Sequence, residues 1–149
     1  MDEPKAQVDL NGEFRFKTDA KGRMSLPAKF RRVLSSELVV TRDLEDECIL
    51  VFEPEVFNEW VVSLFNHRFE GGYNPTDRKH QAMRRKLKSR ALDVQVDNAG
   101  RIMLSAEQRA ACGIDRDVVI VGNTGYFEVW DAKRYDAADA EIDLSEFLS

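Results

Sequence analysis

The feature that most constrains this chain is an internal repeat. The segment DAKGRMSL at residues 19–26 recurs at residues 97–104 as DNAGRIML, an offset of 78 residues (97 minus 19). The match continues outward at the same offset, where Phe14, Phe16, Ala28, Arg31 and Phe52 correspond to Leu92, Val94, Ala106, Arg109 and Trp130. Agreement in the motif, its flanks and its closing segment indicates a duplication, so the fold must be built from two similar units.

Both units show the same order of expected elements. Alternation of apolar and polar residues predicts half-buried strands at residues 14–17 and 92–96. A turn follows, in which Gly22 or Gly100 is free to take a positive φ, and the next strand is expected to complete a hairpin. A short helix comes next, and two strands close each unit, at residues 38–40 and 49–52 in the first and 118–121 and 127–130 in the second.

Helical sequence separates the two units. Apolar residues between Val56 and Phe65 recur at the spacing of one helix face, Gly71 and Gly72 break the chain, and a basic helix is expected over about residues 76–90. A unit of roughly 45 residues is too small to bury much apolar surface alone. We therefore expect a mostly β fold with short helices (α+β), in which two units share one core by interleaving strands. The expected divisions are residues 13–57, a helical linker at 58–90, residues 91–135, and an acidic tail at 136–149.

Charge is distributed unevenly along the chain. The net charge is −5 at pH 7, which by itself argues against an anionic partner. Residues 13–32, however, contain seven bases and two acids, and residues 76–90 contain seven bases and one acid. Residues 91–149 contain five bases and twelve acids. This distribution is typical of a molecule with one face for an anionic partner and another for solvent.

Several classes of protein find little support in the sequence. No apolar stretch approaches the roughly 20 residues of a membrane helix, and residues 1–5 contain no hydrophobic run, so we expect no membrane partner and a cytoplasmic location. Cys48 and Cys112 lack neighbouring zinc ligands and are expected to be buried thiols. His67 and His80 fall in no nucleophile or metal motif and are expected at the surface. We therefore expect no enzyme, no metal and no cofactor.

The first repeat carries a longer pattern, F-x-F-x-x-D-x-K-G-R-x-x-L-P-A-x-x-R. Its residues are Phe14, Phe16, Asp19, Lys21, Gly22, Arg23, Leu26, Pro27, Ala28 and Arg31. This pattern resembles the opening of MraZ proteins, and Asp97 with Arg101 stands where that family repeats its motif. The resemblance covers about residues 10–135. The chain departs from it in an extension before Leu10, in Ala99 where the first loop has Lys21, and in an acidic tail after Tyr135.

The resemblance implies both a fold and a function. It implies two tandem SpoVT/AbrB-like swapped-hairpin β-barrel units, a closed homo-oligomeric ring, and a nucleoid-associated transcriptional regulator. Such proteins bind G-rich repeats in the promoter of the division and cell wall gene cluster, usually as repressors. The family's loops carry the contacts to double-stranded DNA, which points to Arg23 first, then Lys21, and by the repeat to Arg101. Asp19, Gly22, Asp97 and Gly100 would then structure the loops.

Alternatives remain open for these residues. Each aspartate–arginine pair is also explained as an ion pair that stabilises its loop, with or without a role in binding. Arg15 and Lys17 face outward if their phenylalanine neighbours face inward, which makes them either phosphate contacts or a solvated strand face. The basic helix is either a charged surface, facing solvent or another subunit, or a DNA contact. Two rival functions are a non-catalytic oligomeric protein-interaction module and, more remotely, a small β-barrel enzyme.

Overall fold

The computed structural model of the chain describes residues 8–148. These residues form an α+β fold with one six-stranded antiparallel sheet and one two-stranded ribbon. In chain order the elements are β1 (Glu13–Lys17), β2 (Arg23–Ser25), α1 (Ala28–Arg31), β3 (Glu37–Arg42), β4 (Ile49–Phe52), α2 (Pro54–Arg68), α3 (Arg78–Ser89), β5 (Leu92–Gln95), β6 (Arg101–Met103), α4 (Ala106–Ala111), β7 (Asp117–Gly122), β8 (Tyr126–Asp131), α5 (Ala132–Ala140) and the 3₁₀ helix η1 (Leu144–Leu148).

The strands of the two repeats are exchanged. The large sheet has the order β1-β7-β8-β4-β3-β5, and the ribbon pairs β2 with β6. The pairs β1–β7, β2–β6, β3–β5 and β4–β8 each join one repeat to the other, whereas β3–β4 and β7–β8 lie within a repeat. All six pairs are antiparallel. The prediction of two units that share one core by interleaving strands is therefore confirmed.

The prediction that the first two strands of each repeat pair with each other as a hairpin is wrong. The turn after β1 closes locally, with the amide N of Asp19 3.0 Å from the carbonyl O of Arg23. The chain then leaves the sheet, because β1 forms its ladder with β7 and β2 forms its ladder with β6. The second repeat does the same, with β5 paired to β3. Each turn therefore joins two strands whose partners both belong to the other half.

The core follows from this exchange. Met24 and Phe30 of the first repeat are fully buried in one cluster with Ile102, Leu104 and Phe127 of the second. A second cluster lies on the other face of β3 and β4, where α2 covers the sheet with Phe57, Val61 and Phe65. Full burial of such a side chain stabilises the fold by about 1.5–3 kcal/mol. The predicted apolar face of the first linker helix is thus confirmed as the face that packs on the sheet.

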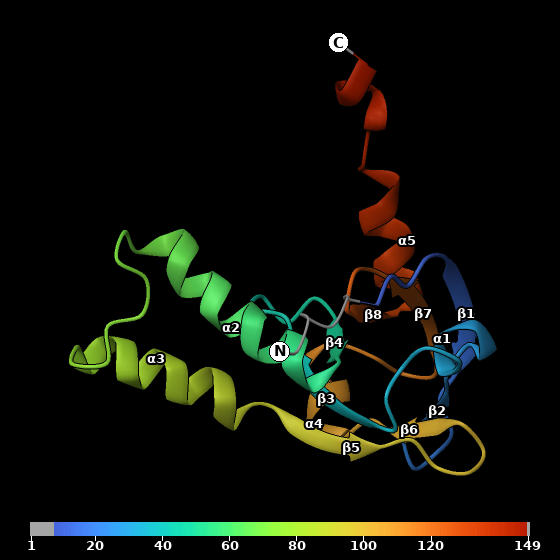
Figure 1. Cartoon of the computed structure of the whole chain (residues 1–149). Coiled ribbons are helices and arrows are strands. Elements are labelled where there is room, and N and C mark those ends of the chain that lie inside the picture. Colours follow the sequence, from blue (N-terminus) through green and yellow to red (C-terminus); the bar gives the residue numbers. More distant parts are fainter. Residues whose placement is uncertain (1–7, 149) are drawn as a thin grey trace.

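Two helical extensions leave the body in different directions (Figure 1). The first is the pair α2 and α3, which pack side by side, with the aromatic ring of Phe65 5.4 Å from that of His80. The expected linker boundary at residue 58 falls inside α2. The second is α5 followed by the terminal segment, residues 141–148, so the expected acidic tail is largely helical. No helix within residues 8–148 is both long and apolar enough to span a membrane. The extension expected before Leu10 lies mostly outside the described residues.

Candidate nucleic-acid interface

The first candidate loop is organised by the carboxylate of Asp19. Its Oδ1 accepts hydrogen bonds from the backbone amides of Lys21 and Arg23, each at 2.9 Å. Its Oδ2 accepts one from Nε of Arg23 at 2.6 Å. Gly22, at φ +87°, completes the turn in a conformation that other residues rarely adopt. The expected ion pair is therefore present, and it fixes the arginine at the start of β2.

The second candidate loop repeats this geometry almost atom for atom. Oδ1 of Asp97 accepts hydrogen bonds from the amides of Ala99 and Arg101 at 2.9 Å, and Oδ2 accepts from Nε of Arg101 at 3.0 Å. Gly100 has φ +78°. In both loops the hydrogen bonds to the aspartate, first among them that from the arginine amide, lower the pKa of its carboxyl below the ordinary value of 3.8. Both carboxylates are therefore ionised at neutral pH and hold their arginines by charge as well as by geometry.

Each loop is braced by the opposite repeat. The carbonyl of Gly22 accepts a hydrogen bond from the amide of Leu104 at 2.8 Å, and that of Gly100 accepts one from Leu26 at 2.9 Å. A Cβ on Gly22 would overlap the Leu104 carbonyl and lie 2.7 Å from Nε of Arg109. Glycine is therefore required at this position both by its φ and by the close approach of the other half.

The ribbon turns both arginines outward. Its register places Arg23 opposite Met103 and Arg101 opposite Ser25, with Met24 opposite Ile102 between them. Since side chains alternate across a strand, the first two pairs share one face and the central pair occupies the other. The central pair is fully buried, and both arginine side chains are 35% exposed. The two arginines are diagonal neighbours on the ribbon, so their backbone positions are about 7–8 Å apart by the usual geometry of antiparallel strands.

The arginines keep donors available for a ligand. In each, Nε is bonded to the aspartate, and within the described residues no acceptor is hydrogen-bonded to the terminal amino groups. Lys21 is exposed at the tip of the first loop, and Ala99 occupies the corresponding position of the second. The ribbon and its loops therefore present three outward cations, two in the first repeat and one in the second.

Arg15 and Lys17 lie elsewhere, on the edge strand β1. Arg15 forms a two-point ion pair with Asp136 of α5, with the shorter contact at 2.6 Å, and this carboxylate raises the arginine pKa. Lys17 lies 3.8 Å from Asp117 of β7. Both pairs are at least half exposed. The structure brings together Arg23, Lys21 and Arg101 in the ribbon and its loops, and places these two residues on the sheet.

The basic helix α3 uses part of its charge for packing. The guanidinium of Arg84 lies 5.0 Å from the centre of the Tyr73 ring, and Nζ of Lys88 lies 5.0 Å from that of Phe57 and 3.0 Å from Oδ1 of Asn58. His80, at the start of this helix, is buried among aromatic rings and accepts a hydrogen bond from the amide of Asn74 at 3.0 Å. The prediction that His80 lies at the surface is therefore wrong, because aromatic residues of α2 and of the interhelical turn close around it.

Two further cations lie beside the loops, and the sequence analysis did not identify them as part of the candidate site. Arg31 packs against Gly100, and Arg109 packs against Gly22 and donates from Nε to the Leu104 carbonyl at 3.1 Å. Their equivalence at the repeat offset was visible in the sequence. Their placement across the repeats depends on the strand exchange and was not.

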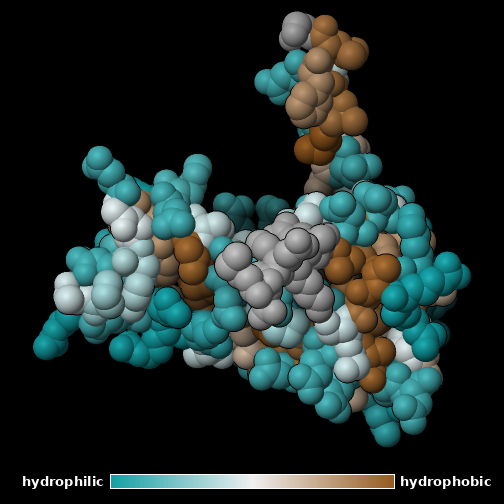
Figure 2. Space-filling view, viewed as in Figure 1, coloured by the Kyte–Doolittle hydropathy of each residue, from teal (hydrophilic) through white to brown (hydrophobic). Residues whose placement is uncertain are grey.

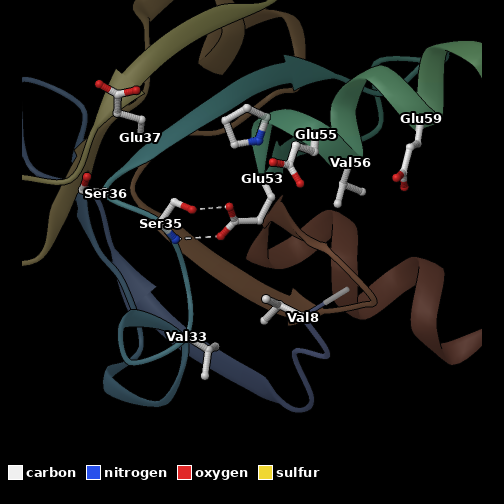
Figure 3. Close-up of a pocket in the computed structure, with 10 residues that line it drawn as sticks. Val8, Val33, Ser35, Ser36, Glu37, Glu53, Glu55, Val56 and Glu59 are labelled. Atoms are coloured by element: carbon white, nitrogen blue, oxygen red, sulfur yellow. Dashed lines mark hydrogen bonds between the residues drawn. The ribbon is translucent and has the colours of Figure 1, made fainter. Parts of the chain in front are cut away.

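The remaining features do not fit an anionic ligand or a metal. A cavity of about 270 Å³ between α2 and β3 is lined by four glutamates, one of which, Glu53, accepts hydrogen bonds from Ser35 (Figure 3). Within residues 8–148 no group of three or more histidine, cysteine or carboxylate side chains could hold a metal ion. Both cysteines are buried thiols, as predicted, and burial raises the pKa of Cys112 to about 11. The outward face of the ribbon is the site best suited to a polyanion.

Two repeats that share one core and expose paired arginines on a β-ribbon define a duplicated α+β protein with a candidate nucleic-acid interface. The family model described as "MraZ protein, putative antitoxin-like" matches residues 10–70 and 87–147. The chain therefore belongs to the MraZ family. The second match reaches residue 147, so the expectation that the tail after Tyr135 departs from the family is wrong.

Individual relatives agree with this assignment. A protein named transcriptional regulator MraZ from Burkholderia cenocepacia is 37% identical over 128 residues, which cover 81% of this chain and 81% of the relative. One of the same name from Variovorax paradoxus is 36% identical over 135 residues, covering 86% of each chain. A third, from Polaromonas sp., is 37% identical over 130 residues, covering 83% of this chain and 82% of the relative.

Proposed function

We propose that this protein is a transcriptional regulator that binds double-stranded promoter DNA through the outward face of the β2–β6 ribbon. The observation that carries the proposal is the pair of outward arginines, Arg23 and Arg101, each held by its own aspartate. A two-stranded ribbon fits the major groove of DNA, which is about 12 Å wide. The naming of the relatives as transcriptional regulators supports the same function.

Each residue of the ribbon has a role in this proposal. Nε of Arg23 is bonded to Asp19, so its two terminal amino groups remain free to donate to O6 and N7 of one guanine. Arg101 does the same from the second loop. Lys21 contacts a phosphate, which adds affinity without sequence preference. The loop-structuring residues, Asp19 and Gly22 with Asp97 and Gly100, hold the arginines in place.

Arg15 and Lys17 contribute to DNA binding only by exchanging partners. Both are paired with carboxylates of this chain, at Asp136 and Asp117. These pairs are exposed and therefore weak, and a phosphate can replace either carboxylate if DNA reaches β1. We propose them as secondary phosphate contacts that act after the ribbon has engaged.

The proposal extends to assembly and target. The exchanged repeats, taken as residues 13–57 and 91–135 with a helical linker between, correspond to SpoVT/AbrB-like swapped-hairpin units. The chain forms a closed homo-oligomeric ring that presents the ribbon repeatedly, so G-rich repeats in one promoter gain avidity. It represses the division and cell wall gene cluster, and it acts in the cytoplasm at the nucleoid without a cofactor.

Footprinting on the DNA upstream of the protein's own gene tests this function. We expect protection of short G-rich repeats, with affinity that falls steeply as salt rises because phosphate contacts release counterions. A scrambled duplex of the same composition is the control. Equal binding to both duplexes would refute sequence-specific regulation. No binding to either would favour the rival function, a module whose arginines pair with an acidic protein.

A further inference from the structure

The terminal segment, residues 141–148, exposes apolar side chains that nothing in the described chain covers. Phe147 is 85% exposed and Leu148 is 87% exposed, and Ile142 and Leu144 are each about two-thirds exposed. Figure 2 shows these hydrophobic residues gathered along the projecting end of the molecule. Three acids alternate with them, at Glu141, Asp143 and Glu146. The segment is therefore apolar and acidic at once.

The repeat shows what such a helical extension does when it is covered. α5 follows β8 as α2 follows β4, so the two helices are equivalents in the two repeats. α2 buries Phe57, Val61 and Phe65 against the sheet and α3, whereas α5 and η1 contain no buried residue. Within residues 8–148 no second helix packs on this extension as α3 packs on α2, so its apolar side chains are left for a partner.

An open groove with the opposite charge lies between α2 and α3. It has a volume of about 530 Å³, and its lining is mostly apolar, including Leu64 and Met83. Arg68 and Lys86 stand at its rim. A further rim cation, Arg90, is already paired with Asp46 at 3.1 Å. An apolar groove with a basic rim is complementary to an apolar segment that carries acids.

We propose that the terminal segment of one copy docks into the α2–α3 groove of a second copy. Phe147 and Leu144 enter the groove, and the acids of the segment face Arg68 and Lys86. Such a contact is heterologous, because each copy offers a different surface to each neighbour, and it generates a ring when the rotation closes. The inference supplies the interface of the proposed ring, but it involves no DNA contact and can be tested without DNA.

Sedimentation velocity of the full-length protein, without DNA, is the first test. We expect an oligomer, and we expect the variant Leu144→Asp/Phe147→Asp to weaken self-association at least about 30-fold, as removal of a central apolar anchor does. The matched control is Val62→Asp. Like the tail variant it replaces an exposed apolar residue by a charged one, but Val62 lies on α2 outside the groove. A monomeric parent protein, or a tail variant as large as the parent, would overturn the proposal.

Cross-linking identifies the partner surface directly. A copy with Leu148→Cys, which keeps the anchors Leu144 and Phe147, is mixed with a differently tagged copy carrying Met83→Cys, a residue of the groove that is 38% exposed. Docking between copies should give a covalent heterodimer, whereas Val62→Cys in place of Met83→Cys should give none. The native thiols do not compete, because Cys48 and Cys112 are buried. Absence of the heterodimer, including the case in which the segment folds back on its own groove, would overturn the proposal. Failure here would leave the DNA-binding role of Arg23 untouched.

Discussion

Replacement of Arg23 by alanine is the sharpest probe of the ribbon. The aspartate of the loop occupies Nε, so two terminal donors remain, which is what a bidentate contact to guanine uses. Their removal should weaken binding by about 1–3 kcal/mol per loop, a factor of roughly 5–150 in Kd. Preference for guanine at the contacted position should relax at the same time.

Fluorescence anisotropy with a single-repeat duplex, at fixed salt, measures both effects. Arg23→Lys keeps the charge but not the planar fork of donors, so it should retain phosphate attraction and show no base preference. Arg85→Ala removes an exposed arginine from α3 and is the charge-matched control. If Arg23→Ala retained the parent's oligomeric state and its full promoter affinity, the base-reading role of this residue would be refuted.

The corresponding change in the second repeat, Arg101→Ala, should do less damage. Its loop has the same geometry but carries Ala99 where the first loop has Lys21, so it brings one cation fewer to the DNA. Part of its effect should come from a loosened loop and appear as a lower Tm. Equal reductions of affinity for the Arg23 and Arg101 variants, at equal thermal stability, would show that the two repeats contribute alike.

Three other outcomes follow from the loops. Lys21→Ala should flatten the slope of log affinity against log salt by about 0.9 for each phosphate that the lysine neutralises, with little change in sequence preference in the same anisotropy assay. Gly22→Ala should lower the stability by more than about 1 kcal/mol in urea unfolding, because of its positive φ and close neighbours, whereas Gly71→Ala, which meets nothing within 4 Å, should be neutral or slightly stabilising. Because the folded-state pKa values of Asp19 and Asp97 lie below 3.8, their contribution to stability is fully present above that pH and is lost as pH falls through the folded values. Asp97→Asn removes this titrating group, so its Tm should fall less than that of the parent protein between about pH 5 and 2.5. The same decline in both proteins would contradict a stabilising role for the ionised Asp97.

Most of the secondary structure could be predicted from the sequence, but the strand pairing could not. Alternation in β1 and β5 shows which face of each strand is buried, because side-chain period reflects burial. It does not show which strand lies alongside. Because both repeats carry the same motif, a partner strand for β2 could come from its own repeat or from the other one, and the sequence does not show which. The sequence therefore indicated a local hairpin at the start of each repeat, whereas the chain pairs the strands of that hairpin with the other repeat.

The candidate site was predicted to a similar extent. The aspartate, glycine and arginine of each loop belong to one local motif. Each ion pair joins the aspartate to an arginine only four positions later in the chain. Contacts between distant residues carry no such signal, and the packing of Arg109 on Gly22 arises from the strand exchange. Burial of His80 was missed for the same reason, since the rings that enclose it come from α2 and the following turn.

The exchange of strands also governs how the protein is made. Four of the six strand pairs need residues from both repeats, so the first half, once it has left the ribosome, can form only β3 with β4. Its apolar strand edges stay open until the second half has been synthesised. Contacts between residues so far apart in sequence make folding slow and leave those edges open to pairing with other chains. The duplication thus joins two half-proteins into one cooperative unit, and the covalent linker supplies at high effective concentration the partner that a single repeat would have to find by diffusion.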